Sequence, residues 1–224
     1  MKNKILWIGA FFIVLMAAFY FFLFAGTDYY KAKLPVLSYV KDFSFTDQDG
    51  KQLTQKKIEG KVYVTEYFFT TCKGICPKMN ANMKTIYERY KTESDFAIIS
   101  HTSMPETDSV PLLKAYEQAL LGTTSSKLPA TNWFFVTGSK DSLYKMARES
   151  YLLDNEKNNS MNIKDQFIHT QFFAVVDKEG RVRGVYDGLK NDELDKLSRD
   201  IKDLLKETKT RSGFNNSTFS NNPN

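Results

Sequence analysis

The distribution of apolar and polar residues divides the chain into distinct parts. Ile5 to Ala25 contains no charged residue and is long enough, as a helix, to cross a hydrocarbon layer of about 30 Å. Segments of strand and helix length follow, and beyond Thr208 the sequence is rich in Asn and Ser. We therefore predict a membrane anchor at residues 1–26, a tether at 27–39, a globular domain at 40–208 and a disordered tail at 209–224.

Charged residues around the apolar segment predict its orientation. Lys2, Lys4 and the amino terminus precede it, and basic flanks of a membrane helix tend to stay in the cytoplasm. Lys31 and Lys33 on the other side weaken this asymmetry. A cleaved signal peptide is the alternative, but the apolar stretch exceeds the usual length of about 7 to 15 residues. We predict a single-pass anchor in a bacterial cell membrane, because the sequence lacks a mitochondrial leader, with the N-terminus cytoplasmic and the domain facing the periplasm or the cell exterior.

Strand-length and helix-length segments alternate through the predicted globular domain. The predicted strands are 62–69, 96–100, 133–136, 170–176 and 182–186, and Asp49-Gly50 marks a hairpin turn before them. The predicted helices are 77–90, 110–121, 139–150 and a last helix capped by Asn191. This order is that of a thioredoxin-like α/β domain, in which a central mixed sheet carries helices on both faces.

The composition excludes one class of partner. Charged residues of both signs make up 25% of the chain, and the net charge of +5 is spread over isolated Lys and Arg residues. There is no phosphate-binding glycine loop of the GxxxxGKS type, and no basic stretch is interleaved with aromatic residues. We therefore expect no binding of nucleic acid and no nucleotide chemistry.

The chain has two cysteines, Cys72 and Cys76, at the junction of a predicted strand and a predicted helix. If the loop is helical there, the two sulfurs project from one face with Cβ atoms about 6 Å apart. Backbone N–H groups at the start of the helix would lower the thiol pKa and favour the thiolate. The position of the pair therefore predicts reactive sulfur.

Three functions compete for this pair. A structural disulfide across so short a loop would remove little entropy from the unfolded chain. A dithiol redox site more often has CxxC spacing than the CxxxC spacing found here. Two thiolates also suit Cu(I), but a third donor must then come from elsewhere in the fold.

The search for that donor is short because the chain has only two histidines. His169 precedes the predicted strand 170–176, which could run beside the strand leading to Cys72 and bring the imidazole to the cysteines. A Cys2His set with soft sulfurs suits copper, whereas a structural zinc site normally has four protein ligands.

Five segments carry a family resemblance. They are FSFTDQDGKQLT, GKVYVTEYFF, FFTTCKGICPKM with both cysteines, SHTSMPETDS, and FIHTQFFAVVDKEGRV near the end. Their order and approximate spacing over most of residues 40–207 resemble the SCO/SenC family of membrane-anchored copper proteins. The resemblance implies an outward-facing thioredoxin-like domain that holds copper through Cys72, Cys76 and His169. The expected ion is Cu(I), and binding of Cu(II) is left open.

The resemblance also implies a function and partners. A metallochaperone, which is not an enzyme, would deliver copper to the dinuclear copper centre of cytochrome c oxidase or prepare the thiols of that centre. Its partners would be the copper-centre subunit of the oxidase, a copper donor and a thiol reductant. The alternative is an enzyme, a membrane-tethered thiol-disulfide oxidoreductase that uses Cys72 and Cys76 and for which His169 is largely dispensable. A copper or redox sensor is a third interpretation, but the sequence contains no output domain.

Two positions depart from the family pattern. Lys73-Gly74-Ile75 stands between the cysteines where many members have Pro and Asp, and the lysine charge should favour thiolate. Met104 stands where an Asp is common, which bears on partner docking or redox tuning. Met79, Met83 and His101 are auxiliary candidates for ligands, although methionines at helical spacing usually belong to the core.

Overall fold

The computed structural model describes residues 2–24, 34–122, 132–154, 162–163, 166–168 and 170–207. The chain divides into two compact units, residues 1–34 and 35–224. The predicted ligand His169 and the predicted tail at 209–224 lie outside the described residues.

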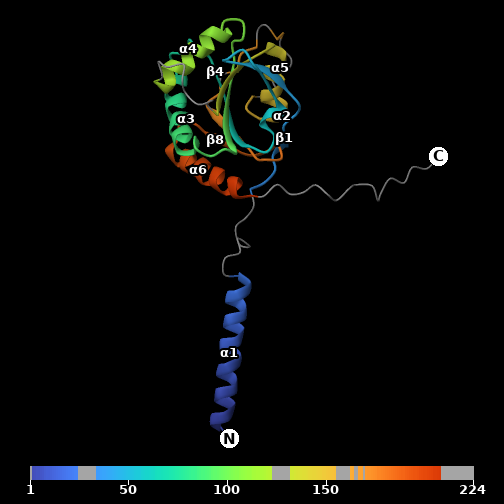
Figure 1. The fold of residues 1–224 in the computed structure, drawn as a ribbon, viewed down its shortest axis with the longest axis vertical. Helices are drawn as coiled ribbons and strands as arrows, with labels where there is room; N and C mark the ends of the chain where they lie inside the picture. Colours follow the sequence, from blue (N-terminus) through green and yellow to red (C-terminus); the bar gives the residue numbers. More distant parts are fainter. Residues whose placement is uncertain are drawn as a thin grey trace, which may run out of the picture. The chain divides into compact units, whose positions relative to one another are not determined.

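Helix α1 (Lys2–Phe24) forms the first unit (Figure 1). Its described side chains from Trp7 to Phe22 are all exposed. The helix corresponds to the apolar segment of the sequence but ends before Ala25, which lies outside the described residues. Within the ranges that the structure describes, no helix combines the length and hydropathy needed to cross a membrane, so the predicted transmembrane helix is not confirmed.

A mixed sheet forms the centre of the second unit (Figure 1). Its strands among the described residues are β1 (Ser38–Tyr39), β2 (Ser44–Asp47), β3 (Gln52–Thr54), β4 (Val62–Phe68), β5 (Phe96–Thr102), β6 (Trp133–Thr137), β7 (Phe172–Val176) and β8 (Arg181–Asp187). They lie in the order β1-β8-β7-β4-β5-β6-β2-β3. Strands β4, β5 and β6 are parallel to one another, and the remaining pairs are antiparallel. The predicted central mixed sheet is confirmed.

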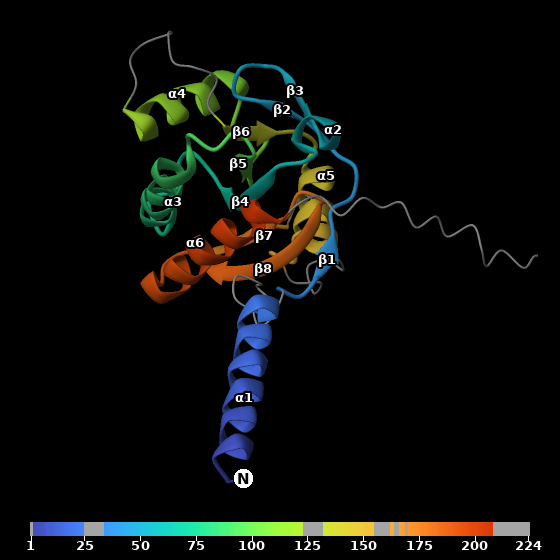
Figure 2. The ribbon, with the colours of Figure 1, turned by 60° about the horizontal axis from the view of Figure 1, so that its bottom comes forward.

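Helices lie on both faces of this sheet (Figure 2). They are α2 (Gln55–Ile58), α3 (Cys76–Tyr90), α4 (Val110–Leu121), α5 (Lys140–Lys145) with the π-helix η2 (Met146–Ser150), and α6 (Asn191–Lys206). Helices α3, α4 and α6 cover one face, where Tyr87 of α3 packs on Trp133 of β6 at 5.3 Å between ring centroids. On the other face, the Tyr67 hydroxyl donates to the Leu143 carbonyl of α5.

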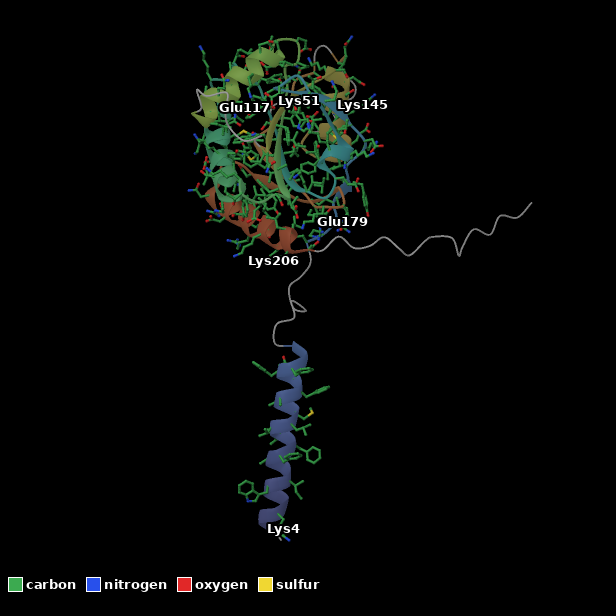
Figure 3. The ribbon with its side chains drawn as sticks, viewed as in Figure 1. Lys4, Lys51, Glu117, Lys145, Glu179 and Lys206 are labelled. Atoms are coloured by element: carbon green, nitrogen blue, oxygen red, sulfur yellow. The ribbon has the colours of Figure 1, made fainter. Side chains whose placement is uncertain are left out.

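Side-chain burial follows from this layered arrangement. Every residue of β4 and of β5 is buried, because helices cover both faces of these central strands. The charged side chains of Lys51, Lys145 and Lys206 are exposed and lie around the outside of the domain (Figure 3). Glu66 of β4 differs from these charged residues, since it is 0% exposed in the core.

Some element boundaries differ from the sequence predictions. Strand β5 continues to Thr102 and includes His101, because β4 and β6 provide hydrogen-bonding partners on both sides. Strand β7 begins at Phe172 rather than at residue 170. Asn191 is the first residue of α6, and Lys190 occupies the N-cap position predicted for it.

The helix predicted at 139–150 changes form in its second half. Ser139 caps α5 as predicted, since its hydroxyl accepts a hydrogen bond from the Ser142 N–H. In η2 the Tyr151 N–H donates to the Met146 carbonyl at 3.0 Å, which is the wider i→i−5 pattern. Leu152 then takes the left-handed conformation with φ 58°, where glycine is usual after a helix.

Candidate metal and thiol site

The two cysteines lie at the junction of β4 and α3, where the parallel strands end. Helix α3 begins at Cys76, and Cys72 precedes it in a loop that is not helical. The Cys72 N–H donates to the Phe69 carbonyl at 3.2 Å, which forms a tight turn directly after β4. Both cysteines are free, and their thiols are joined by a hydrogen bond. The loop therefore brings the sulfurs together without the helical turn considered from the sequence.

The environment of Cys72 favours its thiolate. Partial burial alone would raise the pKa of the Cys72 thiol, but hydrogen bonds from the Cys76 thiol and from backbone N–H groups of residues 74–76 lower it below its ordinary value. These donors lie at the start of α3, where backbone N–H groups have no partner within the helix. The side chain is half-buried, so this sulfur is accessible to a partner.

The environment of Cys76 has the opposite effect. Its side chain is only 3% exposed. Burial raises the pKa of the Cys76 thiol, and the hydrogen bond donated to Cys72 raises it further, while the Phe69 N–H acts in the other direction. The outer sulfur therefore loses its proton more readily than the inner one.

Asp108 fixes the turn between β4 and the cysteines. Its carboxylate accepts hydrogen bonds from the Thr70 hydroxyl at 2.6 Å and from the Thr70 N–H at 3.2 Å. The Thr102 hydroxyl, at the end of β5, donates to the same carboxylate at 2.5 Å. Sequence analysis did not single out Asp108, although it belongs to the SHTSMPETDS segment.

Glu66 is a second residue that sequence analysis missed. The Ser100 hydroxyl donates to Glu66 Oε1 at 2.7 Å, and Oε2 has no hydrogen-bond partner. Burial raises the pKa of Glu66 to about 8, although the Ser100 hydrogen bond opposes the shift. A charged residue within the otherwise apolar and aromatic run VYVTEYFF was the available signal.

The segment that leads to His169 lies beside the cysteine loop. The Phe167 ring contacts the Phe69 ring edge to face, with 5.5 Å between centroids. Ile168 is buried, and its N–H lies 3.4 Å from the Tyr144 hydroxyl. His169 itself is outside the described residues, so its predicted role as a ligand stays a prediction. Within the described part of the chain, no group of three His, Cys, Asp or Glu residues is arranged to hold a metal ion.

The structure places all three auxiliary candidates in the core. Met79 and Met83 are both 0% exposed on the inner side of α3. His101 is also 0% exposed and stacks on Tyr67, with 5.0 Å between ring centroids and 16° between planes. Its ring lies on the α5 face of the sheet, whereas α3 covers the other face. Met104 is half-buried, and its N–H bonds the Thr102 hydroxyl.

Comparisons with known proteins agree with the sequence resemblance. The family model described as SCO1/SenC matches residues 32–206. A Bacillus subtilis protein, the SCO1 protein homolog, is 32% identical over 172 residues, which cover 76% of this chain and 84% of that protein.

Solved structures show the same fold. The crystal structure of a SCO1/SenC family lipoprotein from Bacillus anthracis matches with a TM-score of 0.63 and 31% identity, covering 77% of this chain and 99% of that chain. The structure of BsSco, described as a member of the Sco family of cytochrome c oxidase assembly proteins with a disulfide switch, matches with a TM-score of 0.62 and 31% identity, covering 79% and 99%. These matches confirm the predicted fold class of a mixed sheet flanked by helices, as in thioredoxin-like Sco proteins. The chain belongs to the SCO1/SenC family.

Proposed function

We propose that the protein binds copper through Cys72, Cys76 and His169 and delivers it to the dinuclear copper centre of cytochrome c oxidase, or prepares the thiols of that centre. Two soft sulfurs, one of them favoured as thiolate, fit Cu(I) as the cargo. An imidazole would complete a three-donor set without the fourth ligand of a structural zinc site. BsSco, which is 31% identical to this chain, is described as a member of a family of cytochrome c oxidase assembly proteins.

The observation that carries the proposal is the contact between Phe69 and Phe167 at 5.5 Å. Phe69 lies three residues before Cys72, and Phe167 lies two residues before His169. Two residues of chain span at most about 7 Å, so the contact limits how far the imidazole can be from the thiols. This limit supports a shared site, although the sequence separates these residues by nearly a hundred positions.

The two sulfurs differ in access, which suits transfer rather than storage. Cys72 is half-buried and Cys76 is buried, so an incoming thiolate of the target would meet the metal from the Cys72 side. The target sulfur would bind as the Cys72 sulfur leaves, and Cys76 would leave last. Such exchange keeps copper coordinated at every stage and involves no turnover of the protein as a catalyst.

We also propose that residues 1–26 attach the domain to a bacterial cell membrane, with the domain outside the cytoplasm. Trp7 at 79%, Phe21 at 73% and Phe22 at 85% exposure present a large apolar surface along α1, which water solvates poorly. The Bacillus anthracis relative is described as a lipoprotein. Extraction of membrane fractions with carbonate tests the attachment, since release of the full chain into the soluble fraction would contradict it.

The central test is an anaerobic Cu(I) titration of the full chain in detergent against a competing chelator. Cys72→Ala, Cys76→Ala and His169→Ala should each weaken binding severely, because each removes one of three donors. His101→Phe is the matched control, since it removes the other imidazole of the chain and should leave the affinity unchanged. Tight binding that ignores His169 would contradict the three-ligand site.

The alternative function is a thiol-disulfide oxidoreductase, and the opposite pKa shifts of the Cys72 and Cys76 thiols favour it. The Cys72 thiolate would attack a target disulfide, and one target sulfur would leave as a thiolate. Cys76 would then lose its proton and attack Cys72, which releases the reduced target and leaves a Cys72–Cys76 disulfide for an external thiol reductant. Reduction of a model disulfide at an equal rate by the wild type and by His169→Ala, with weak copper binding in both, would favour this function.

A further inference from the structure

Asp108 is a buried carboxylate placed at the end of the turn that follows β5. Its side chain is 0% exposed. The Asp108 N–H donates to the Met104 carbonyl at 2.9 Å, which closes the turn and directs the carboxylate toward Thr70. A carboxylate so enclosed needs hydrogen-bond donors in place of water. The donors are the Thr70 N–H and the hydroxyls of Thr70 and Thr102.

These donors lie at or just beyond the ends of two neighbouring strands. Thr102 is the last residue of β5, and Thr70 follows the end of β4 by two residues. The Ser103 N–H extends the contact between the strands by donating to the Phe68 carbonyl at 2.7 Å. Asp108 therefore acts as a common acceptor that ties the cysteine turn to its neighbouring strand.

The tie leads directly to both sulfurs. Thr70 is held through its N–H and its hydroxyl, so the peptide between Phe69 and Thr70 has little freedom. The Phe69 N–H donates to the Cys76 sulfur, and the Phe69 carbonyl accepts from the Cys72 N–H. One fixed residue, Phe69, therefore contacts both cysteines, and its orientation depends on the Thr70 anchor beside it.

We propose that Asp108 is a positioning residue for the cysteine pair: through Thr70 it holds the turn after β4 so that the Cys72 and Cys76 sulfurs stay at the spacing needed to chelate one ion or to join each other. The proposal rests on the proposed function for its copper readout, but not for its disulfide readout. Both events require two sulfurs that are already close, and a looser turn would lower their effective concentration. A purely structural Asp108 would affect folding stability alone.

The test compares Asp108→Asn with a matched control, Asp47→Asn, in the full chain in detergent. Asp47 is also buried, at 2% exposure, and accepts backbone hydrogen bonds from Asp49 at 3.0 Å and Lys51 at 2.8 Å in the β2–β3 turn, away from the cysteines. Three quantities are measured: the urea midpoint, the Cu(I) affinity, and the equilibrium constant for closing the Cys72–Cys76 disulfide in glutathione buffers. Thr70→Val, which removes only the hydroxyl, is the milder variant to use if Asp108→Asn does not fold.

We expect Asp108→Asn to lower the Cu(I) affinity about tenfold, which is typical when a residue that orients metal ligands through hydrogen bonds is lost. The equilibrium constant for closing the Cys72–Cys76 disulfide should fall as well. Asp47→Asn should lower the urea midpoint and leave both site quantities unchanged. Thr70→Val should give a smaller loss, and combining it with Asp108→Asn should add nothing, because both act through one contact. Unchanged site quantities in Asp108→Asn, or additive losses in the double variant, would overturn the proposal. If the wild type binds no copper, the proposed function fails, while the disulfide equilibrium still decides the role of Asp108.

Discussion

The buried carboxyl group of Glu66 should give the domain a distinctive dependence of stability on pH. Burial raises the pKa of Glu66 from its ordinary 4.5 to about 8, so the folded protein keeps this proton where the unfolded chain releases it. Between these two values the native state binds more protons than the unfolded state, and stability must fall as pH rises. The contribution of Glu66 is fully present below pH 4.5 and is lost by about pH 8.

The magnitude follows from the same two values. The interval from 4.5 to about 8, at about 1.36 kcal/mol for each pH unit, corresponds to about 5 kcal/mol as an upper figure. Glu66→Gln keeps the shape and the acceptor for the Ser100 hydroxyl but cannot ionise. The variant should therefore gain about 3 to 5 kcal/mol relative to the wild type between pH 5 and pH 8.5.

Urea unfolding of both proteins at half-unit steps of pH measures this difference directly. Glu88→Gln is the matched control, because Glu88 is exposed on α3 and should leave the pH dependence of the wild type in place. Other titrating groups are shared by the proteins compared, so they cancel in the difference. Parallel stability curves for wild type and Glu66→Gln would refute the argument, since they would mean that Glu66 ionises in the folded core without a penalty.

Three further predictions concern the other face of the sheet. Arg148→Met should lower the free energy of unfolding, measured in urea, by about 3 to 5 kcal/mol, because Asp154 would lose its 2.7 Å ion pair while its side chain is only 8% exposed. Adding Asp154→Leu should recover much of this stability, because no unpaired charge would then stay buried. Leu152→Gly should raise the free energy of unfolding by about 1 kcal/mol, since it relieves a φ of 58° at a half-exposed side chain; a lower urea midpoint would contradict this. Burial lowers the pKa of His101 to about 3, so its contribution to stability is lost as pH falls from about 6.5 toward 3. His101→Phe should therefore reduce the dependence of the free energy of unfolding on pH over this acid range.

Local signals allowed much of the fold to be predicted. Helix α4 has the predicted bounds, because Ser109 precedes it and Gly122, with φ 71°, ends it. Strand β4 could be recognised from its β-branched and aromatic residues. The cysteine pair was found because the chain has no other cysteines and places these two at a strand–helix junction.

Features that depend on distant partners could not be predicted in this way. The predicted strand 96–100 ends before His101, but pairing with two neighbouring strands extends β5 through this residue. Strand β1 lies within the segment that was predicted to be a tether. It could not be predicted, because its pairing with β8 joins residues that are far apart in the sequence. Asp108 acts on Thr70 across 38 positions, and no periodic pattern carries that information.

The two outermost strands of the sheet are its shortest. Strand β1 has 2 residues and β3 has 3, so each lateral edge offers few unpaired N–H and carbonyl groups. Long open edges are where separate molecules join their sheets and aggregate. Many copies of this domain can therefore be crowded together, as attachment to a common surface would require, with little tendency to polymerise through their strands.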